Sequence, residues 1–260
     1  SDPKRVVGSY RALGTWMLGY PDQAVEINEV STAHARRRGH PFDLGSALTL
    51  GGLLWEHRGE SAPMLARAAE AEQVGRAYSL PFISEVLAQV LTGGAWLRAG
   101  RLADGIARLR DALATYTAYG NQVAMPYFRA CLAEGLALSG DNAGGLRLIE
   151  ESLTQIARPG WEERCYLAEI LRLKGWMLAR QGDLDGAQQH YLAALDWARQ
   201  QQAKSWELRT ATSLARLWHL QDQTTAAHAL LSPVYHWFTE GFDTPDLTAA
   251  HALLQELAEA

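Results

Sequence analysis

The side chains best suited to catalysis are scattered along this chain and form no recognisable catalytic motif. The 260 residues include eight His and two Cys, but no H-E-x-x-H, C-x-x-C, G-x-S-x-G or P-loop pattern. The stretch Gly182-Asp-Leu-Asp-Gly186 has the look of a calcium loop, yet Ala187 and Ala194 stand where such a loop needs oxygen ligands. We therefore expect a protein that is not an enzyme and that uses no metal and no cofactor.

Arginine, aromatic, histidine and acidic side chains form a second set, which would suit binding. Arg and Trp are enriched among the residues that dominate binding energies, and a guanidinium group pairs in a fork with carboxylates and phosphates. We expect twelve residues, chosen by their positions within a repeat, to line a concave groove: Trp16, Glu56, His57, Arg98, Tyr127, Glu134, Glu169, Arg172, Trp176, Arg180, Trp218 and His219. For Trp16, Trp176 and Trp218 a packing role is an equal alternative.

The repeat that sets these positions has a period of about 40 residues. Its turn residue recurs at Gly19, Gly59, Gly100, Gly140, Gly182 and Gln221. Because glycine and proline end helices, each turn is expected to separate two helices. The fifth copy resembles the tetratricopeptide signature, with Gly175, Ala187 and Tyr191 at the positions of the consensus Gly, Ala and Phe.

This repeat predicts an all-α fold, a tetratricopeptide-like right-handed superhelical solenoid of about six helix pairs with a C-terminal capping helix. Apolar residues recur at helical spacing, and alternating β-type runs are absent from the sequence. One domain, 1–260, is expected to hold repeats at about 5–39, 41–79, 81–119, 122–158, 161–202 and 204–240, with the cap at 244–260. Within them, we expect first helices at 122–139 and 161–181 in the fourth and fifth pairs, and a last paired helix at 223–239.

The last third of the chain carries phrases that go beyond a generic repeat. "AKSWELR" begins at Ala203, "SLARLW" at Ser213 and "YHWFTEGFDT" at Tyr235. These phrases resemble the C-terminal tetratricopeptide-like region of large bacterial signalling ATPases, in which an adenylate cyclase or DNA-binding domain precedes a nucleotide-binding ATPase. The resemblance covers most of the chain, but its specific motifs lie in 168–250.

This resemblance implies a place in a larger architecture. The chain would be the sensor or assembly arm of a protein in signal transduction or transcription regulation, similar in organisation to the maltose-type transcription activators. It would then be a part excised from a larger protein. Cyclase, DNA-binding and ATPase chemistry would belong to the missing part, and the resemblance carries over no catalytic residue.

Charge and composition restrict the partners. A net charge of -5 disfavours direct binding to nucleic acid or to an anionic membrane, and no run of about 18 apolar residues could span a membrane. Cys131 and Cys165 fit buried thiols in a reducing cytoplasm. We expect the partner to be a protein or peptide, a domain of the parent chain, or a small effector. The alternative is a structural scaffold that self-associates as a homo-oligomer without a ligand.

Overall fold

The computed structural model describes the backbone of residues 3–259 and the side chains of residues 8–259, and over that range the chain is all-α. Thirteen α-helices and one π-helical segment follow one another through residues 3–259. Their bounds are α1 Pro3–Met17, α2 Pro21–Arg38, α3 Pro41–Arg58, α4 Ser61–Ala77, η1 Phe82–Leu87, α5 Ala88–Arg98, α6 Leu102–Ala118, α7 Met125–Leu138, α8 Asn142–Ile156, α9 Leu167–Arg180, α10 Leu184–Gln200, α11 Lys204–Leu220, α12 Thr224–Tyr235 and α13 Pro245–Glu259. The predicted fold class, a tetratricopeptide-like solenoid of helix pairs with a capping helix, is confirmed.

The turns fall where the repeat places them. The five predicted turn glycines all have left-handed backbone conformation, from Gly59 at a φ of 75° to Gly140 at 102°. In the sixth repeat the left-handed residue is Asp222, at a φ of 60°, one position after the predicted Gln221. An aspartate tolerates this conformation because its short polar side chain can bond locally.

Two predicted first helices begin later than expected. α7 begins at Met125 rather than at 122, because Ala124 adopts a left-handed conformation with a φ of 56° and Pro126 occupies the first turn. α9 begins at Leu167 rather than at 161. The loop before it contains Glu163, whose carboxylate accepts from the backbone N–H of Ala124 in the loop before α7. α12 ends at Tyr235 rather than at 239, two residues after an internal proline. Backbone conformation, proline and one contact between neighbouring loops therefore set these boundaries.

Small residues bring the two helices of a pair into close contact. An added Cβ at Gly93 of α5 would lie 2.9 Å from the backbone nitrogen of Leu109 in α6. An added Cβ at Gly175 of α9 would lie 2.9 Å from the carbonyl oxygen of Ala187 in α10. Since real Cβ atoms do not approach backbone this closely, only glycine allows these helix spacings.

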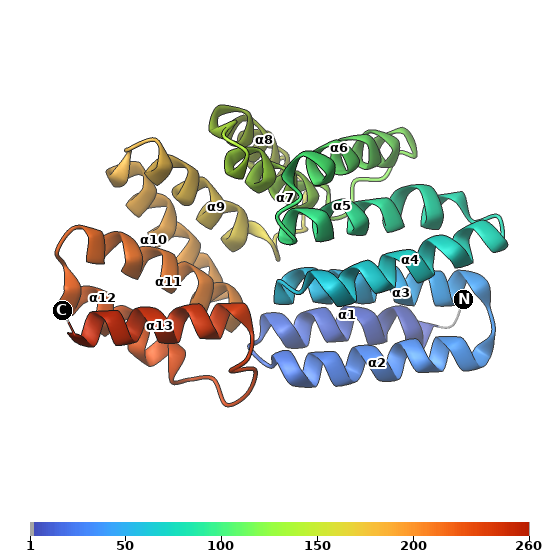
Figure 1. The fold of residues 1–260 in the computed structure, drawn as a ribbon, viewed down its shortest axis with the longest axis horizontal. Coiled ribbons are helices and arrows are strands. Elements are labelled where there is room, and N and C mark those ends of the chain that lie inside the picture. The colour runs from blue at the N-terminus through green and yellow to red at the C-terminus, as the bar shows by residue number, and fades with distance from the viewer. Residues whose placement is uncertain (1–2, 260) are drawn as a thin grey trace.

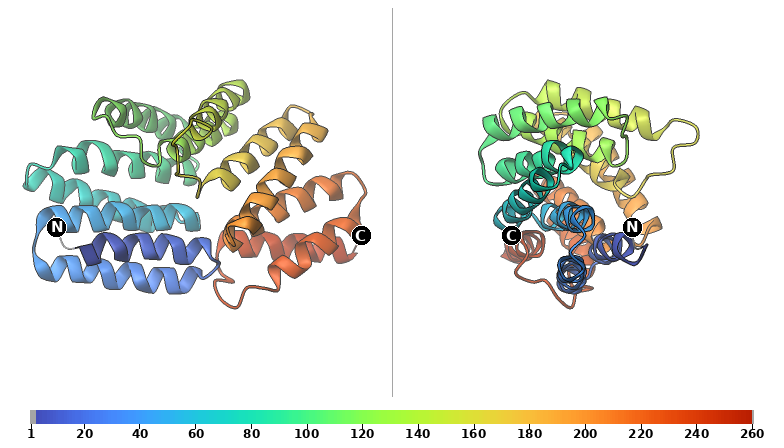
Figure 2. Two further views of the ribbon diagram at one scale, coloured as in Figure 1. Left: turned by 180° about the vertical axis from the view of Figure 1, so that it is seen from behind. Right: turned by 90° about the vertical axis from the view of Figure 1, so that its right-hand side faces the viewer.

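The superhelix turns so tightly that its first and last repeats meet, with α1 and α2 beside the segment from α11 to α13 (Figures 1 and 2). The hydroxyl of Ser205 in α11 donates to the carbonyl oxygen of Trp16 in α1 at 2.5 Å. One carboxylate oxygen of Glu240 accepts from the backbone N–H groups of Asp22 and Gln23, at 2.9 and 3.1 Å, and so caps α2 from the far end of the chain. The inner faces of the odd-numbered helices consequently surround one axis.

Gly19→Ala is expected to destabilise the protein more than Gly100→Ala. Both residues have positive φ, 97° and 77°, so an alanine at either position costs about 1–2 kcal/mol in backbone strain. At Gly19 the added Cβ would also lie 2.5 Å from a ring carbon of Trp237 and 2.7 Å from Cβ of Lys204, whereas at Gly100 it meets nothing within 4 Å. The free energies of unfolding from urea titrations measure the difference, and equal losses would contradict closure between the first and last repeats.

Candidate functional site

Eight of the twelve predicted groove residues come together on the axis of the superhelix. They lie on the inner faces of five odd-numbered helices: Trp16 on α1, Glu56 and His57 on α3, Arg98 on α5, Tyr127 and Glu134 on α7, and Glu169 and Arg172 on α9. The repeat brings them together because each first helix presents the same side to the axis. Glu56, His57, Tyr127, Glu169 and Trp16 are each at most 3% exposed, so these side chains need partners inside the protein.

Arg98 joins two of the inner helices by ion pairs. Its Nη2 lies 2.8 Å from Oε1 of Glu56 on α3 and 3.0 Å from Oε2 of Glu134 on α7. The hydroxyl of Tyr127 also donates to Glu56. Burial alone would raise the pKa of Glu56, but the charge of Arg98 and these hydrogen bonds lower it to about 2. Glu56 is therefore a buried carboxylate that stays ionised.

A second group of ion pairs joins α9, α11 and α13. Arg172 forms a fork with Glu169, with Nε and Nη2 2.7 and 2.8 Å from its two carboxylate oxygens. Arg209 of α11 reaches Glu169 at 3.3 Å and Asp246 of α13 at 2.8 Å, and it also donates to the carbonyl oxygen of His57. Together the two groups form the axial ion network: Arg98, Arg172, Arg209, Glu56, Glu134, Glu169 and Asp246.

The sequence prediction missed two members of this network. Arg209 lies twelve residues before the turn position Gln221, close to the thirteen that separate Glu169 from Gly182. The repeat register could therefore have identified Arg209. Asp246 belongs to the capping helix, which follows no repeat register, so no such signal pointed to it.

An aromatic cluster lies beside the ion network. The His57 ring stacks on Trp16 with centroids 4.9 Å apart, and it lies 5.2 Å from Tyr127 and 5.5 Å from Trp206. Both His57 ring nitrogens are buried without a hydrogen-bond partner among the described residues. Burial lowers the pKa of His57 to about 4, so the ring is neutral near pH 7. Protonation would place a positive charge on a buried ring whose two nitrogens have no hydrogen-bond acceptor among the described residues.

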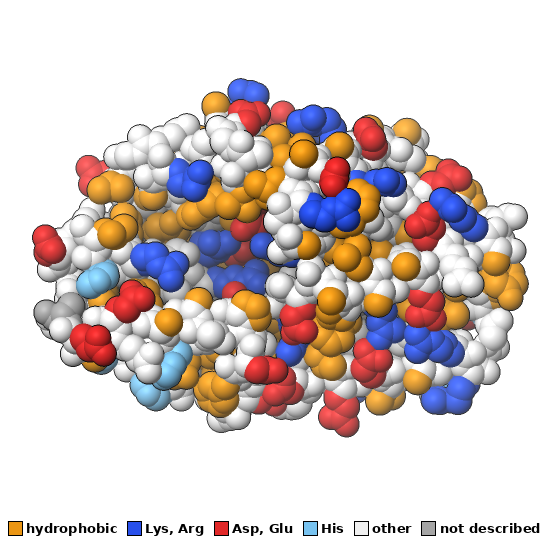
Figure 3. Space-filling view, viewed as in Figure 1, with side chains coloured by type: hydrophobic (Ala, Val, Ile, Leu, Met, Phe, Trp, Pro, Cys, Tyr) orange, Lys and Arg blue, Asp and Glu red, His pale blue; other side chains and the backbone are white. Residues whose placement is uncertain are grey.

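The ion network borders a polar cavity of about 280 Å³, here called the ionic cavity. It lies where the ends of α3 and α5 face α9, α11 and α13, and Figure 3 shows basic and acidic side chains on the floor of a hollow in this region. Its lining consists of Gly59, Arg98, Glu134, Glu169, Arg172, Arg209, Thr212, Ser213, Arg216, Pro245, Asp246 and Ala249. Such a cavity offers both carboxylates and guanidinium groups to a ligand, a combination that suits a polar chain such as a peptide.

Of the twelve predicted groove residues, Arg98, Glu134, Glu169 and Arg172 line the ionic cavity. Four others make different contacts: Trp176, Arg180, Trp218 and His219. The guanidinium of Arg180 lies 5.0 Å from the centre of the Trp176 ring and donates to a carbonyl of α7. Trp218 packs against the C-terminal core and donates to the amide oxygen of Gln188 on α10 at 2.8 Å. His219 lies beside Thr224, the first residue of α12. A role for these residues in binding stays a prediction.

The fold and the cavity define the chain as a tetratricopeptide-like solenoid with a polar axial site. No family model matches the sequence, and no curated protein matches it. The described residues hold no cluster of three metal-binding side chains. Within the same range, every helix is too short or too polar to cross a lipid bilayer.

Solved structures of bacterial regulators share this fold. The quorum sensor NprR in complex with its cognate peptide NprX matches with a TM-score of 0.65 at 14% identity, over 99% of this chain and 72% of that one. The apo form of NprR from B. thuringiensis matches with a TM-score of 0.62 at 15% identity, over 94% and 68% of the two chains. The Rap conjugation gene regulator of the plasmid pLS20, in complex with a Phr peptide, matches with a TM-score of 0.62 at 12% identity, over 97% of this chain and 71% of that one. At these identities the similarity concerns the fold.

The free energy of unfolding is expected to fall by about 2 kcal/mol between pH 7 and pH 5, mainly through His57. Its pKa is about 4 in the folded protein and near 6.5 when unfolded, so the unfolded chain takes up the proton first and stability decreases as the pH falls below 6.5. Urea titrations of the wild type and His57→Phe at both pH values test this. The phenylalanine variant keeps an aromatic ring and is expected to lose most of the pH dependence; an unchanged dependence would contradict a buried neutral His57.

Proposed function

We propose that this chain is a non-catalytic binding module that takes an acidic segment of a peptide or protein in the ionic cavity. The proposal rests on the position of Arg216 and on its lack of an acidic partner within the described residues. This residue of α11 lines the cavity, is exposed, and makes no hydrogen bond or ion pair with any residue that the structure describes. Arg98, Arg172 and Arg209 are all held by acidic side chains. Arg216 is thus the cavity's available cation.

A peptide would satisfy both kinds of group in this cavity. Its acidic side chain or C-terminal carboxylate would pair with Arg216 in a fork. Its backbone N–H groups would donate to Glu134, which is only partly buried and whose Oε2 lies 3.0 Å from Nη2 of Arg98. The axial ion network would hold Glu134 in place and would lose little entropy on binding, because its side chains are already ordered.

The structural neighbours support this proposal by analogy. NprR and the Rap regulator have the same fold, and each has been solved with a bound peptide. The resemblance of 168–250 to signalling ATPases supports a further step, in which the module is the cytoplasmic sensor or assembly arm of a larger signalling or transcription-regulating protein. The partner would then be a peptide, a domain of the parent chain or a small acidic effector. A P-loop ATPase encoded upstream in the same reading frame would support that architecture.

Arg216→Ala is expected to weaken binding of an acidic peptide by about tenfold or more, because a hydrogen-bonded charge pair typically contributes 1.5–3 kcal/mol. Peptides are selected from a random library on the immobilised chain, and their affinities are measured by fluorescence anisotropy. Arg147→Ala is the matched control, since Arg147 on α8 is also exposed, lies outside the cavity and makes no such contact within the described range. Equal affinities for both variants, or no selected peptide with an acidic group, would contradict the proposal.

Light scattering distinguishes the scaffold alternative. A binding module is expected to have a mass that does not change with its concentration or with Arg216→Ala. Oligomers that grow with concentration and remain in the Arg216→Ala variant would instead favour self-association as the function.

A further inference from the structure

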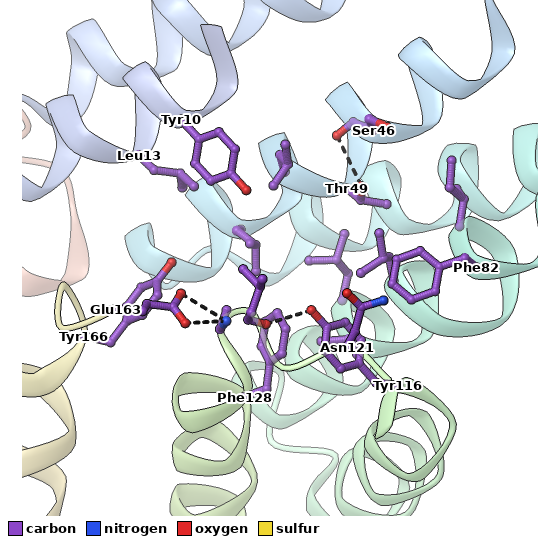
Figure 4. Close-up of a pocket in the computed structure, with 18 of the residues that line it drawn as sticks. Tyr10, Leu13, Ser46, Thr49, Phe82, Tyr116, Asn121, Phe128, Glu163 and Tyr166 are labelled. Carbon is purple, nitrogen blue, oxygen red and sulfur yellow. Dashed lines mark hydrogen bonds between the residues drawn. The ribbon is translucent and has the colours of Figure 1, made fainter. Parts of the chain in front are cut away.

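A second cavity, of about 270 Å³, lies near the opposite ends of the inner helices (Figure 4). We call it the aromatic cavity. Its walls come from α1, α3, the segment from η1 to α5, the end of α6, and the loops before α7 and α9. Aromatic rings line much of it: Tyr10, Phe42, Phe82, Tyr116, Phe128 and Tyr166. It shares no lining residue with the ionic cavity, so a ligand here would be a different one.

One carboxylate, that of Glu163, lies on this otherwise largely apolar wall. Its two oxygens accept from the backbone N–H of Ala124, at 3.0 and 2.9 Å. Burial raises the pKa of Glu163, and the Ala124 hydrogen bond offsets this only in part. No basic side chain forms an ion pair with Glu163 in the part of the chain that the structure describes. A partly buried carboxylate beside aromatic rings, without a cation of its own, is a site for an external cation.

Two tyrosine hydroxyls add further hydrogen-bonding capacity. The Tyr116 hydroxyl already donates to the carbonyl oxygen of Val123 at 2.7 Å. Tyr10 and Tyr166 line the cavity, and their hydroxyls make no hydrogen bond within the described residues. Tyr166 is only 8% exposed, so most of its ring is packed within the protein. Burial raises the pKa of Tyr166, and the negative charge of Glu163 adds to the effect. Both residues line the cavity, three positions apart in the chain (Figure 4). Each hydroxyl oxygen can accept a proton donor from a ligand.

We propose that the aromatic cavity binds a hydrophobic primary ammonium. The ammonium group would pair with Glu163 and donate to the Tyr166 hydroxyl, and the apolar part would pack among the rings. The volume of the aromatic cavity suits such a ligand. A cavity of about 150 Å³ accommodates benzene, and this larger cavity has room for a bicyclic ring with a short amine arm. Such a group occurs in a free aromatic amine and in the N-terminal residue of a peptide.

Isothermal titration calorimetry at pH 7 with tryptamine and the uncharged 3-ethylindole tests the ammonium. Tryptamine is expected to bind the wild type at least tenfold more tightly than 3-ethylindole. In Glu163→Gln this ratio is expected to fall to near one, while 3-ethylindole binds as before. The glutamine keeps an oxygen acceptor for the Ala124 N–H, so the loop is expected to remain folded. Equal binding of both probes to the wild type, an unchanged ratio in Glu163→Gln, or no binding of tryptamine would overturn the proposal.

Two further binding experiments locate the site and identify the source of the ammonium group. Ser46→Phe, which places a ring in the cavity, is expected to abolish tryptamine binding, whereas Arg216→Ala in the ionic cavity leaves it unchanged. Tryptamine binding that persists in Ser46→Phe would overturn the assignment to this cavity. The ligand is a peptide N-terminus if Trp-Gly-Gly amide with a free N-terminus binds as tightly as tryptamine and its N-acetylated form does not bind. Binding of tryptamine alone supports a free amine.

Discussion

The closure of the superhelix on itself is the constraint on which the rest of this structure depends. Glu240 caps α2 and Ser205 bonds to α1, so the first repeat is held against the last. The odd-numbered helices then face one narrow axis instead of an open groove. Side chains that would be solvated on a concave surface become buried, and each must find a partner within the protein. The axial ion network and the aromatic cluster both follow from this.

The network is better understood as a positioning device than as a source of net stability. Removing ions from water costs several kcal/mol each, and ion pairing in the interior roughly repays that cost. Loss of one member would destabilise the protein. Arg98 pairs with both Glu56 and Glu134, so its removal would leave both carboxylates without their cation. The arrangement therefore fixes the spacing of six inner helices, while Arg216 lines the ionic cavity without an ion pair to any described residue.

The sequence was sufficient for the fold because its main signal is local. Glycines with positive φ recur at the repeat spacing, and backbone conformation alone explains why they end helices. The candidate site was only partly predictable. Repeat register identified Glu56, Arg98 and Glu169 as inner residues, but it could not show that closure would bury them. Long-range contacts also brought in Asp246 from the capping helix, and the aromatic cavity depends on how the loops at Ala124 and Glu163 meet.

Chemical cross-linking between the first and last repeats tests the closed superhelix most directly. Cysteines replace Tyr20 and Trp237, whose ring centroids lie 5.6 Å apart, in a chain in which Cys131 and Cys165 are changed to alanine. Glu240 and Ser205 keep their contacts with the first repeat in this variant. A short bis-maleimide is expected to form an intramolecular cross-link in nearly every native monomer at low protein concentration, and far less often in urea. A helical protein that cross-links no better when native than when unfolded would show that the ends do not meet, and would contradict the buried axial site.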